Sequence, residues 1–154
     1  RSMPTTPSLV GKGVTGLAAG PAASEDDVAV VRALFETVGS VVEVPEAQID
    51  ALSTISGSGP AYVFLLVEEF TKAAVRMGFD HDQARLLAEQ TFIGATSLLA
   101  ASDVDPAELR RRVTSPKGTT ERAVAVLQQA RLDDTFTVAA EAALARAKEL
   151  AAGG

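Results

Sequence analysis

The sequence predicts an all-α fold, a helical domain preceded by a short extended segment. Alanine, leucine and valine dominate the 154 residues, aromatic residues make up only 5%, and tryptophan is absent. This composition favours close-packed helices over a sandwich of sheets. Apolar residues also recur at helical spacing between capping residues and glycines,. We therefore expect a helical domain at residues 21–154 after an extended link at residues 1–20.

The lead-in, residues 3–20, is rich in Pro, Thr and Gly and is expected to form extended chain and turns,. It contains GKGVTG at residues 11–16, a formal match to a dinucleotide-binding pattern. In a working site that pattern opens a helix directly after a strand. Gly20-Pro21 would break such a helix before it is established, so we interpret the match as accidental.

The remaining segments form a series of helices with recognisable starts and stops. Serine, aspartate and proline stand where helices would begin, and glycine stands where two of them would end,. The expected elements are a helix from Ser24 to Gly39, a brief strand at 40–44, a helix from Pro45 through Leu52, and helices at 60–77, 80–102, 105–112, 120–130 and 133–150.

The segment SGSGP, residues 56–60, interrupts an apolar helical pattern just before a long helix. Pro60 suits a first helical position, because the N–H that proline lacks has no intrahelical partner there. Two interpretations remain open. The segment is either a tight corner packed by small residues or a place where a ligand approaches the backbone closely.

The two longest predicted helices, 60–77 and 80–102, carry more apolar residues than the shorter helices of one chain could cover. A helix that is apolar around most of its circumference needs partners on several sides. We therefore predict an obligate dimer in which these long helices interleave.

Composition also excludes several classes of function. A net charge of −6 argues against nucleic acid as a partner, and no apolar run is long enough to span a membrane,. The lack of cysteine fits a reducing cytoplasm, and with His81 as the only histidine we expect no metal site,. Ser58 has no histidine placed to activate it, and the adjacent pairs Glu68-Glu69 and Asp133-Asp134 point to different helix faces.

The segment VTSPKGTT, residues 113–120, is the best candidate site. Three hydroxyl residues and a glycine precede a helix whose first N–H groups lack intrahelical acceptors and favour negative charge,. A small carboxylate could bind these amides, with hydroxyl groups from Ser115, Thr119 or Thr120 adding hydrogen bonds. The alternative is an ordinary capping turn in which Thr119 or Thr120 caps the helix.

Three motifs, MPTTP at residues 3–7, SGSGPAY at 56–62 and TSPKGTT at 114–120, together resemble pyrroline-5-carboxylate reductase. The resemblance implies the C-terminal, dimer-forming domain of a cytoplasmic enzyme that reduces 1-pyrroline-5-carboxylate to L-proline with NADPH or NADH. It implies a homodimer or a ring of dimers. The chain starts with Arg1-Ser2-Met3, without an initiator methionine. Because family members enter the MPxTP segment from a preceding strand, the resemblance implies a fragment that lacks its nucleotide-binding domain and is inactive alone.

The resemblance also assigns the site residues. The substrate loop is Ser115, Lys117, Gly118, Thr119 and Thr120, and Thr120 is the catalytic residue that hydrogen-bonds the ring nitrogen. The cofactor, NADP or NAD, is expected beside Met3, Pro4, Gly59 and Pro60. Two positions depart from the family pattern: Lys117 stands where glycine is more common, and Thr5 stands where asparagine is usual.

Two other functions stay open at this point. One is a non-enzymatic helical dimerisation module, in which SGSGP is a packing corner and TSPKGTT is a cap. The other is a related two-domain hydroxy-acid dehydrogenase, which would need a catalytic lysine on a helix. Lys72 is the candidate for that role, but it lacks the glycine pattern expected around it.

Overall fold

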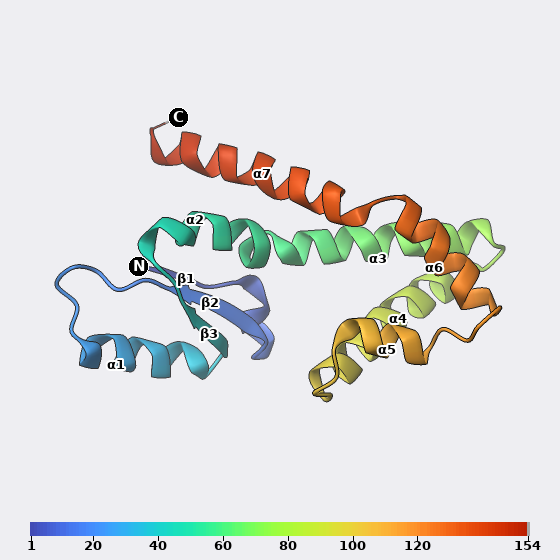
Figure 1. Ribbon diagram of the computed structural model, residues 1–154, viewed down its shortest axis with the longest axis horizontal. Coiled ribbons are helices and arrows are strands. Elements are labelled where there is room, and N and C mark those ends of the chain that lie inside the picture. The colour runs from blue at the N-terminus through green and yellow to red at the C-terminus, as the bar shows by residue number, and fades with distance from the viewer. Residues whose placement is uncertain (154) are drawn as a thin grey trace. The chain divides into compact units, whose positions relative to one another are not determined.

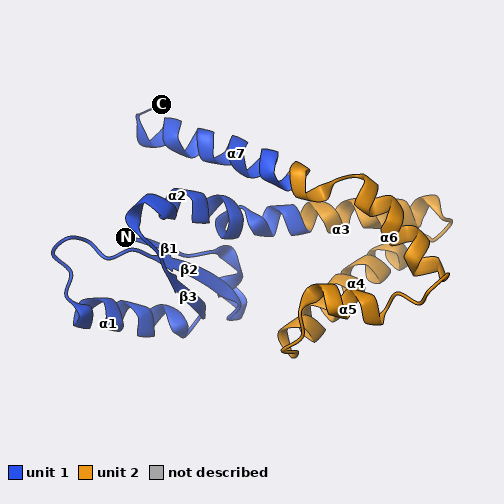
Figure 2. Cartoon of the chain, in the orientation of Figure 1, with its two compact units in different colours: residues 1–63, 136–154 blue, residues 64–135 orange. Residues whose placement is uncertain are grey.

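The computed structural model describes residues 1–153 and is mostly helical, as predicted, with a small three-stranded sheet near the N-terminus (Figure 1). The chain divides into two compact units (Figure 2). Unit 1 combines Arg1–Val63 with Phe136–Gly154, and unit 2 is Phe64–Thr135.

The sheet of unit 1 has the strand order β1-β2-β3. Its strands are β1 (Ser2–Met3), β2 (Gly13–Leu17) and β3 (Gly39–Glu43). β1 pairs antiparallel with β2, and β2 pairs parallel with β3. The 3-10 helix η1 (Thr6–Val10) connects β1 to β2, and helix α1 (Glu25–Glu36) connects β2 to β3. The brief strand predicted at residues 40–44 is therefore confirmed as β3.

Strand β2 passes through the segment that matches a dinucleotide-binding pattern. The chain runs from a turn at Gly11 into β2 and opens no helix there, so it lacks the geometry of a phosphate-binding turn,. Gly39 stands opposite Gly13 with φ +154°, and a Cβ on Gly39 would lie 2.0 Å from the Gly13 carbonyl oxygen. This close approach requires glycine.

Helix α1 begins with a reciprocal cap. The Ser24 hydroxyl accepts a hydrogen bond from the Asp27 N–H at 3.2 Å, and the Asp27 carboxylate accepts one from the Ser24 N–H at 2.9 Å. The predicted start is confirmed. The helix ends at Glu36, before the predicted stop at Gly39, because Gly39 already belongs to β3.

Three short turns of different pitch lead into the SGSGP segment, which begins inside the last of them. These are the 3-10 turn η2 (Glu46–Gln48), helix α2 (Ile49–Leu52) and the π turn η3 (Ser53–Gly57), after which α3 (Gly59–Arg76) begins. Ile49 is fully buried. The Tyr62 hydroxyl donates to the Thr54 carbonyl at 3.1 Å, and the Tyr62 ring lies 6.4 Å from the ring of Phe136. Phe136 belongs to α7 (Leu132–Ala151), whose later residues return to unit 1.

Unit 2 contains the rest of α3 together with α4 (His81–Ala100), α5 (Pro106–Arg112) and α6 (Thr119–Gln129). Asp80 caps α4 and Asp105 caps α5, each through its carboxylate, as predicted. Gly78, with φ +102°, follows the end of α3. The Phe70 and Phe92 rings join α3 to α4 with centroids 6.2 Å apart.

The described chain buries few large apolar side chains. Its buried apolar residues are Leu17, Ala18, Ile49, Ala84 and Ala88. Many others are half exposed or more, including Phe64 at 63%, Leu98 at 57% and Val138 at 65%. Among residues 1–153, no helix has the length and apolar character needed to cross a bilayer.

Candidate functional site

The predicted substrate loop forms a tight turn in front of α6. The Gly118 N–H donates to the Ser115 carbonyl at 3.0 Å, and Lys117 has a positive φ of 61°. Proline at the second position and a positive φ at the third are typical of a type II turn. Gly118 has no room for a side chain, because a Cβ there would lie 2.9 Å from the Ser115 carbonyl oxygen.

The hydroxyl groups of this turn do not cap the helix. Gly118 is the N-cap of α6 and no side chain bonds to the cap, so the alternative in which Thr119 or Thr120 caps α6 is wrong. Threonines inside the other helices, such as Thr71 and Thr91, bond to a carbonyl four residues earlier. Within residues 1–153, the hydroxyls of Ser115, Thr119 and Thr120 make no hydrogen bond, so they are available to a ligand.

Glu121 is a residue of this turn that the sequence reasoning missed. Its carboxylate accepts a hydrogen bond from the Lys117 N–H at 2.9 Å. The sequence contained a signal for this bond. A glutamate three residues after the N-cap can reach back to a backbone N–H at the helix start, as in a capping box. The bond occupies one amide and places a negative charge beside the turn.

Basic residues surround the turn. Arg111 and Arg112 both hydrogen-bond Glu108, which lowers the pKa of that carboxyl to about 2. Within the described chain, Lys117 and Arg110 have no ion-pair partner. Arg110 lines a cavity of about 430 Å³ together with residues that include Thr114, Glu121 and Gln128. Two positive charges without an ion pair in the described chain therefore lie on the predicted substrate loop and in the cavity beside Glu121.

The predicted cofactor residues lie in unit 1. Met3 ends β1, Pro4 follows it and is exposed, and Gly59 and Pro60 are the first two residues of α3. The Met3 side chain lies beside Gly57, because a Cβ on Gly57 would be 3.9 Å from Met3 Cε. The structure therefore places the MPTTP motif next to the SGSGPAY motif.

The glycines of the second motif are not required by packing within the chain. A Cβ on Gly59 would meet no atom within 4 Å, and one on Gly57 would make only ordinary contacts. The corner also contains a π turn, a feature often found at functional sites,. These observations favour close approach by a ligand over a corner that needs small residues for its own packing.

Thr5 holds the first motif in place. Its side chain is 7% exposed, and its hydroxyl oxygen accepts a hydrogen bond from the Val14 N–H at 2.9 Å. The threonine that stands where the resemblance leads us to expect asparagine therefore joins the MPTTP segment to β2.

The other candidate residues do not gather into a site. Lys72 pairs with the Glu69 carboxylate at 2.6 Å, and this hydrogen bond raises the Lys72 pKa, which makes it a poor general base,. His81 is exposed at the start of α4. Among residues 1–153, no group of three or more His, Asp or Glu side chains could hold a metal ion.

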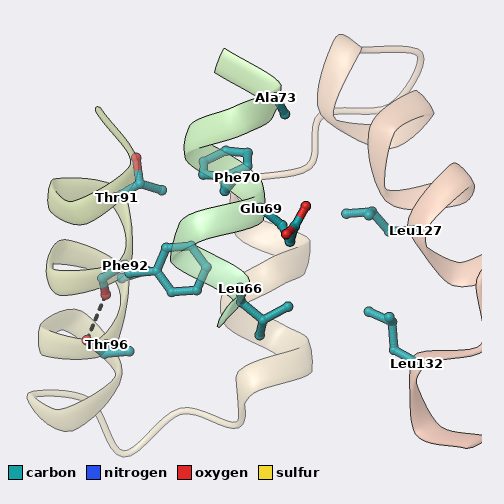
Figure 3. Close-up of a pocket in the computed structure, with 10 residues that line it drawn as sticks. Leu66, Glu69, Phe70, Ala73, Thr91, Phe92, Thr96, Leu127 and Leu132 are labelled. Carbon is teal, nitrogen blue, oxygen red and sulfur yellow. Dashed lines mark hydrogen bonds between the residues drawn. The ribbon is translucent and has the colours of Figure 1, made fainter. Parts of the chain in front are cut away.

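Unit 2 also carries an apolar groove of about 570 Å³ (Figure 3). Leu66 and Phe70 of α3 and Phe92 of α4 line it, with Leu127 and Leu132 facing them. Glu69 is the charged residue at its edge. Large exposed apolar surfaces of this kind are typical of a domain that assembles with a partner. The fold and this surface together define a helical assembly domain with a polar turn at the start of α6.

Comparison with known proteins identifies the family. The model described as "Pyrroline-5-carboxylate reductase dimerisation" matches residues 46–150, and the chain belongs to this family. It is 43% identical to the pyrroline-5-carboxylate reductase of Pseudomonas aeruginosa over 98% of its own length and 56% of that protein. The chain thus spans a little over half of the curated relatives that it matches.

Solved structures agree with this assignment. The pyrroline-5-carboxylate reductase of Coxiella burnetii superposes with a TM-score of 0.93 at 42% identity, over 97% of this chain and 56% of that one. The Plasmodium falciparum pyrroline carboxylate reductase, solved with NADP bound, gives a TM-score of 0.84 at 31% identity, over 96% of this chain and 61% of that one.

Proposed function

We propose that this chain is the dimer-forming and substrate-binding part of an enzyme that reduces 1-pyrroline-5-carboxylate to L-proline. In this proposal a nucleotide-binding domain completes the enzyme, which works in the reducing cytoplasm as a homodimer or a ring of dimers. The observation that carries the proposal is the turn before α6, where three hydroxyl groups and the first helical amides have no partner within the described chain.

The turn suits a small anion with a hydrogen-bond acceptor beside it. The N–H groups at the start of α6 favour a carboxylate, and the unpaired charges of Lys117 and Arg110 add to that preference,. The Ser115 and Thr119 hydroxyls supply further donors to the same carboxylate. Glu121 opposes binding by its charge, so the positive groups and amides must outweigh it.

Thr120 is assigned to the ring nitrogen of the substrate. Its hydroxyl stands one residue into α6 and donates to the nitrogen while the amides hold the carboxylate. The reduction adds hydride to the imine carbon, C2 of the pyrroline ring, and the electrons of the C=N π bond become a lone pair on nitrogen, which accepts the hydrogen bond from Thr120. The neutral secondary amine then takes a proton from water. Orientation is the main contribution of the protein, because the cyclic imine can take up its proton in water before it binds.

Gly59 and Pro60, with Met3 and Pro4, are assigned to the nicotinamide. NADPH or NADH bound there would supply the hydride. The open space at Gly59 and the absence of an N–H on Pro60 fit a flat ring lying against the backbone. The hydroxy-acid dehydrogenase alternative is not favoured, since Lys72 is paired with Glu69.

The uncovered apolar faces support the homodimer. Helices α3 and α4 expose large side chains on several sides, including Phe64, Leu65, Leu86 and Ile93. A second copy that interleaves its own long helices would cover them.

Titration of the chain with L-proline, followed by NMR shifts of the backbone amides, tests the proposed site. We expect Thr120→Ala to weaken binding about tenfold, because it removes the hydroxyl oxygen that accepts a hydrogen bond from the ring ammonium of L-proline, and Thr120→Ser to restore most of it. The matched control is Thr135→Ala, since the Thr135 hydroxyl bonds only to the Arg131 carbonyl of its own segment. Unchanged binding by Thr120→Ala would disprove the role of Thr120. No shifts near residues 115–120 would favour the non-enzymatic dimerisation module.

A further inference from the structure

Helix α4 contains a glycine that its own chain does not require. Gly94 lies in the middle of the helix, it is not among the glycines with positive φ, and a Cβ there would meet no atom within 4 Å. Glycine is a poor helix former, because it loses the most backbone entropy on folding. Neither the backbone conformation nor packing within the chain explains why a side chain is absent at this position.

Gly94 is at the centre of an uncharged and exposed face of α4. At roughly 100° per residue, Leu87 and Leu98 lie on the same face as Gly94, one or two turns away. Leu86 and Ile93 lie roughly 80° and 100° to one side of it, and all four apolar residues are between 45% and 60% exposed,. The polar residues on this face, Gln90 and Ser97, carry no charge.

This face differs from the one that α4 uses within unit 2. Ala84 and Ala88 are buried, at 0% and 1% exposed, and Phe92 meets Phe70 of α3. These residues lie roughly 80° to 160° around the helix from Gly94, on the side away from Leu86 and Ile93. The Gly94 face is therefore a separate surface that no element of unit 2 covers.

We propose that a helix of a second copy of this chain crosses α4 at Gly94, with Leu87 and Leu98 packing on either side of the crossing. The second copy is the occupant because the family model described as dimerisation spans all of α4. A glycine between two exposed leucines lets the backbone of the incoming helix approach closely while the leucines pack against it. The inference rests on the proposed homodimer and names the part of α4 that forms it.

The dissociation constant of the dimer, measured by sedimentation at several concentrations, tests this crossing. We expect Gly94→Leu to weaken the dimer by about tenfold or more, because its side chain would occupy the space of the incoming helix. Ala33→Leu is the matched control, since Ala33 is an exposed alanine of α1 and lies outside residues 46–150, which the dimerisation model matches. It should leave the dissociation constant unchanged. Circular dichroism checks that each variant keeps its helices.

The outcomes separate this inference from the proposed dimer. A wild-type chain that is monomeric would overturn both. A wild-type dimer whose affinity is unchanged or increased by Gly94→Leu would overturn only the crossing at Gly94, as would equal weakening by Ala33→Leu. If Gly94→Leu fails to fold, Gly94→Ala decides. A weaker dimer then supports the crossing, and an unchanged or tighter dimer overturns it.

Discussion

Lys117 adopts a backbone conformation that costs an L-residue energy. Its φ of 61° is in the left-handed region, where a Cβ crowds the neighbouring carbonyl,. The hydrogen bond from its N–H to Glu121 helps to hold this conformation. Its position third in the Ser115–Gly118 turn is the one at which glycine is usual. Lysine at this position therefore lowers the stability of the fold.

We expect Lys117→Gly to increase the free energy of unfolding by about 0.5–1 kcal/mol, because relief of the left-handed strain exceeds the entropy lost by glycine. Urea denaturation at a fixed protein concentration measures this. Lys12→Gly, at a turn residue without positive φ, is the control and should give no gain. A loss of stability in Lys117→Gly would mean that the lysine side chain contributes more to the fold than its conformation costs.

At the scale of the element, α1 shows how one cap links stability to pH. Hydrogen bonds from the Ser24 hydroxyl and the Ser24 N–H lower the pKa of Asp27 below its ordinary value. A carboxyl whose pKa is lowered by folding stabilises the fold above its unfolded-state pKa. That contribution is lost as the pH falls through the folded-state pKa.

We therefore expect Ser24→Ala to lower the free energy of unfolding by about 1 kcal/mol at neutral pH, and the difference from wild type to shrink in acid. Thermal unfolding from neutral to strongly acidic pH measures both effects. Ser40→Ala, at an exposed serine of β3, is the control. A difference that stays constant with pH would show that Asp27 does not take part in the cap.

The elements that sequence reasoning predicted well are those defined by local signals. Asp80 and Asp105 cap helices from their own first turns, and Gly78 ends α3 by its own conformation. Strand β2 was expected only as extended chain, because GVTGL has two glycines and no alternating pattern. Its pairing with β3 depends on contact between distant residues, Gly13 and Gly39.

The candidate site likewise has features that local sequence predicts and features that it does not. The excess of hydroxyl residues in TSPKGTT identified the turn before α6, and that signal is local. The role of Gly118 as N-cap and the return of Glu121 to Lys117 were not predicted, since both depend on the residue at which the helix begins,. The approach of Met3 to Gly57 joins segments more than fifty residues apart, and only the shared family motifs suggested it.

At the scale of the whole molecule, the small buried core determines how the chain must exist in solution. Unit 2 buries Ala84 and Ala88 but leaves Phe64, Leu66 and Leu98 substantially exposed. So small a core offers little hydrophobic stabilisation against the conformational entropy of an isolated chain. In the proposed homodimer, we expect surface buried between copies to supply most of the stabilisation.

Light scattering over a dilution series measures this directly. We expect a mass of about twice 15.9 kDa that persists on dilution, or a larger even multiple if dimers assemble into a ring,. A folded monomer at every concentration would contradict the interleaved dimer. The long helices would then have to be stable with their apolar faces in water.

The discontinuity of unit 1 has a consequence for synthesis. Its first part ends at Val63 and is completed only by Phe136 and the residues that follow, where the Phe136 ring meets Tyr62. At ~5–20 residues per second, a ribosome needs several seconds to make the intervening unit 2. The SGSGP corner therefore emerges before unit 2, but Tyr62 beside it meets Phe136 only after the last helix has been made.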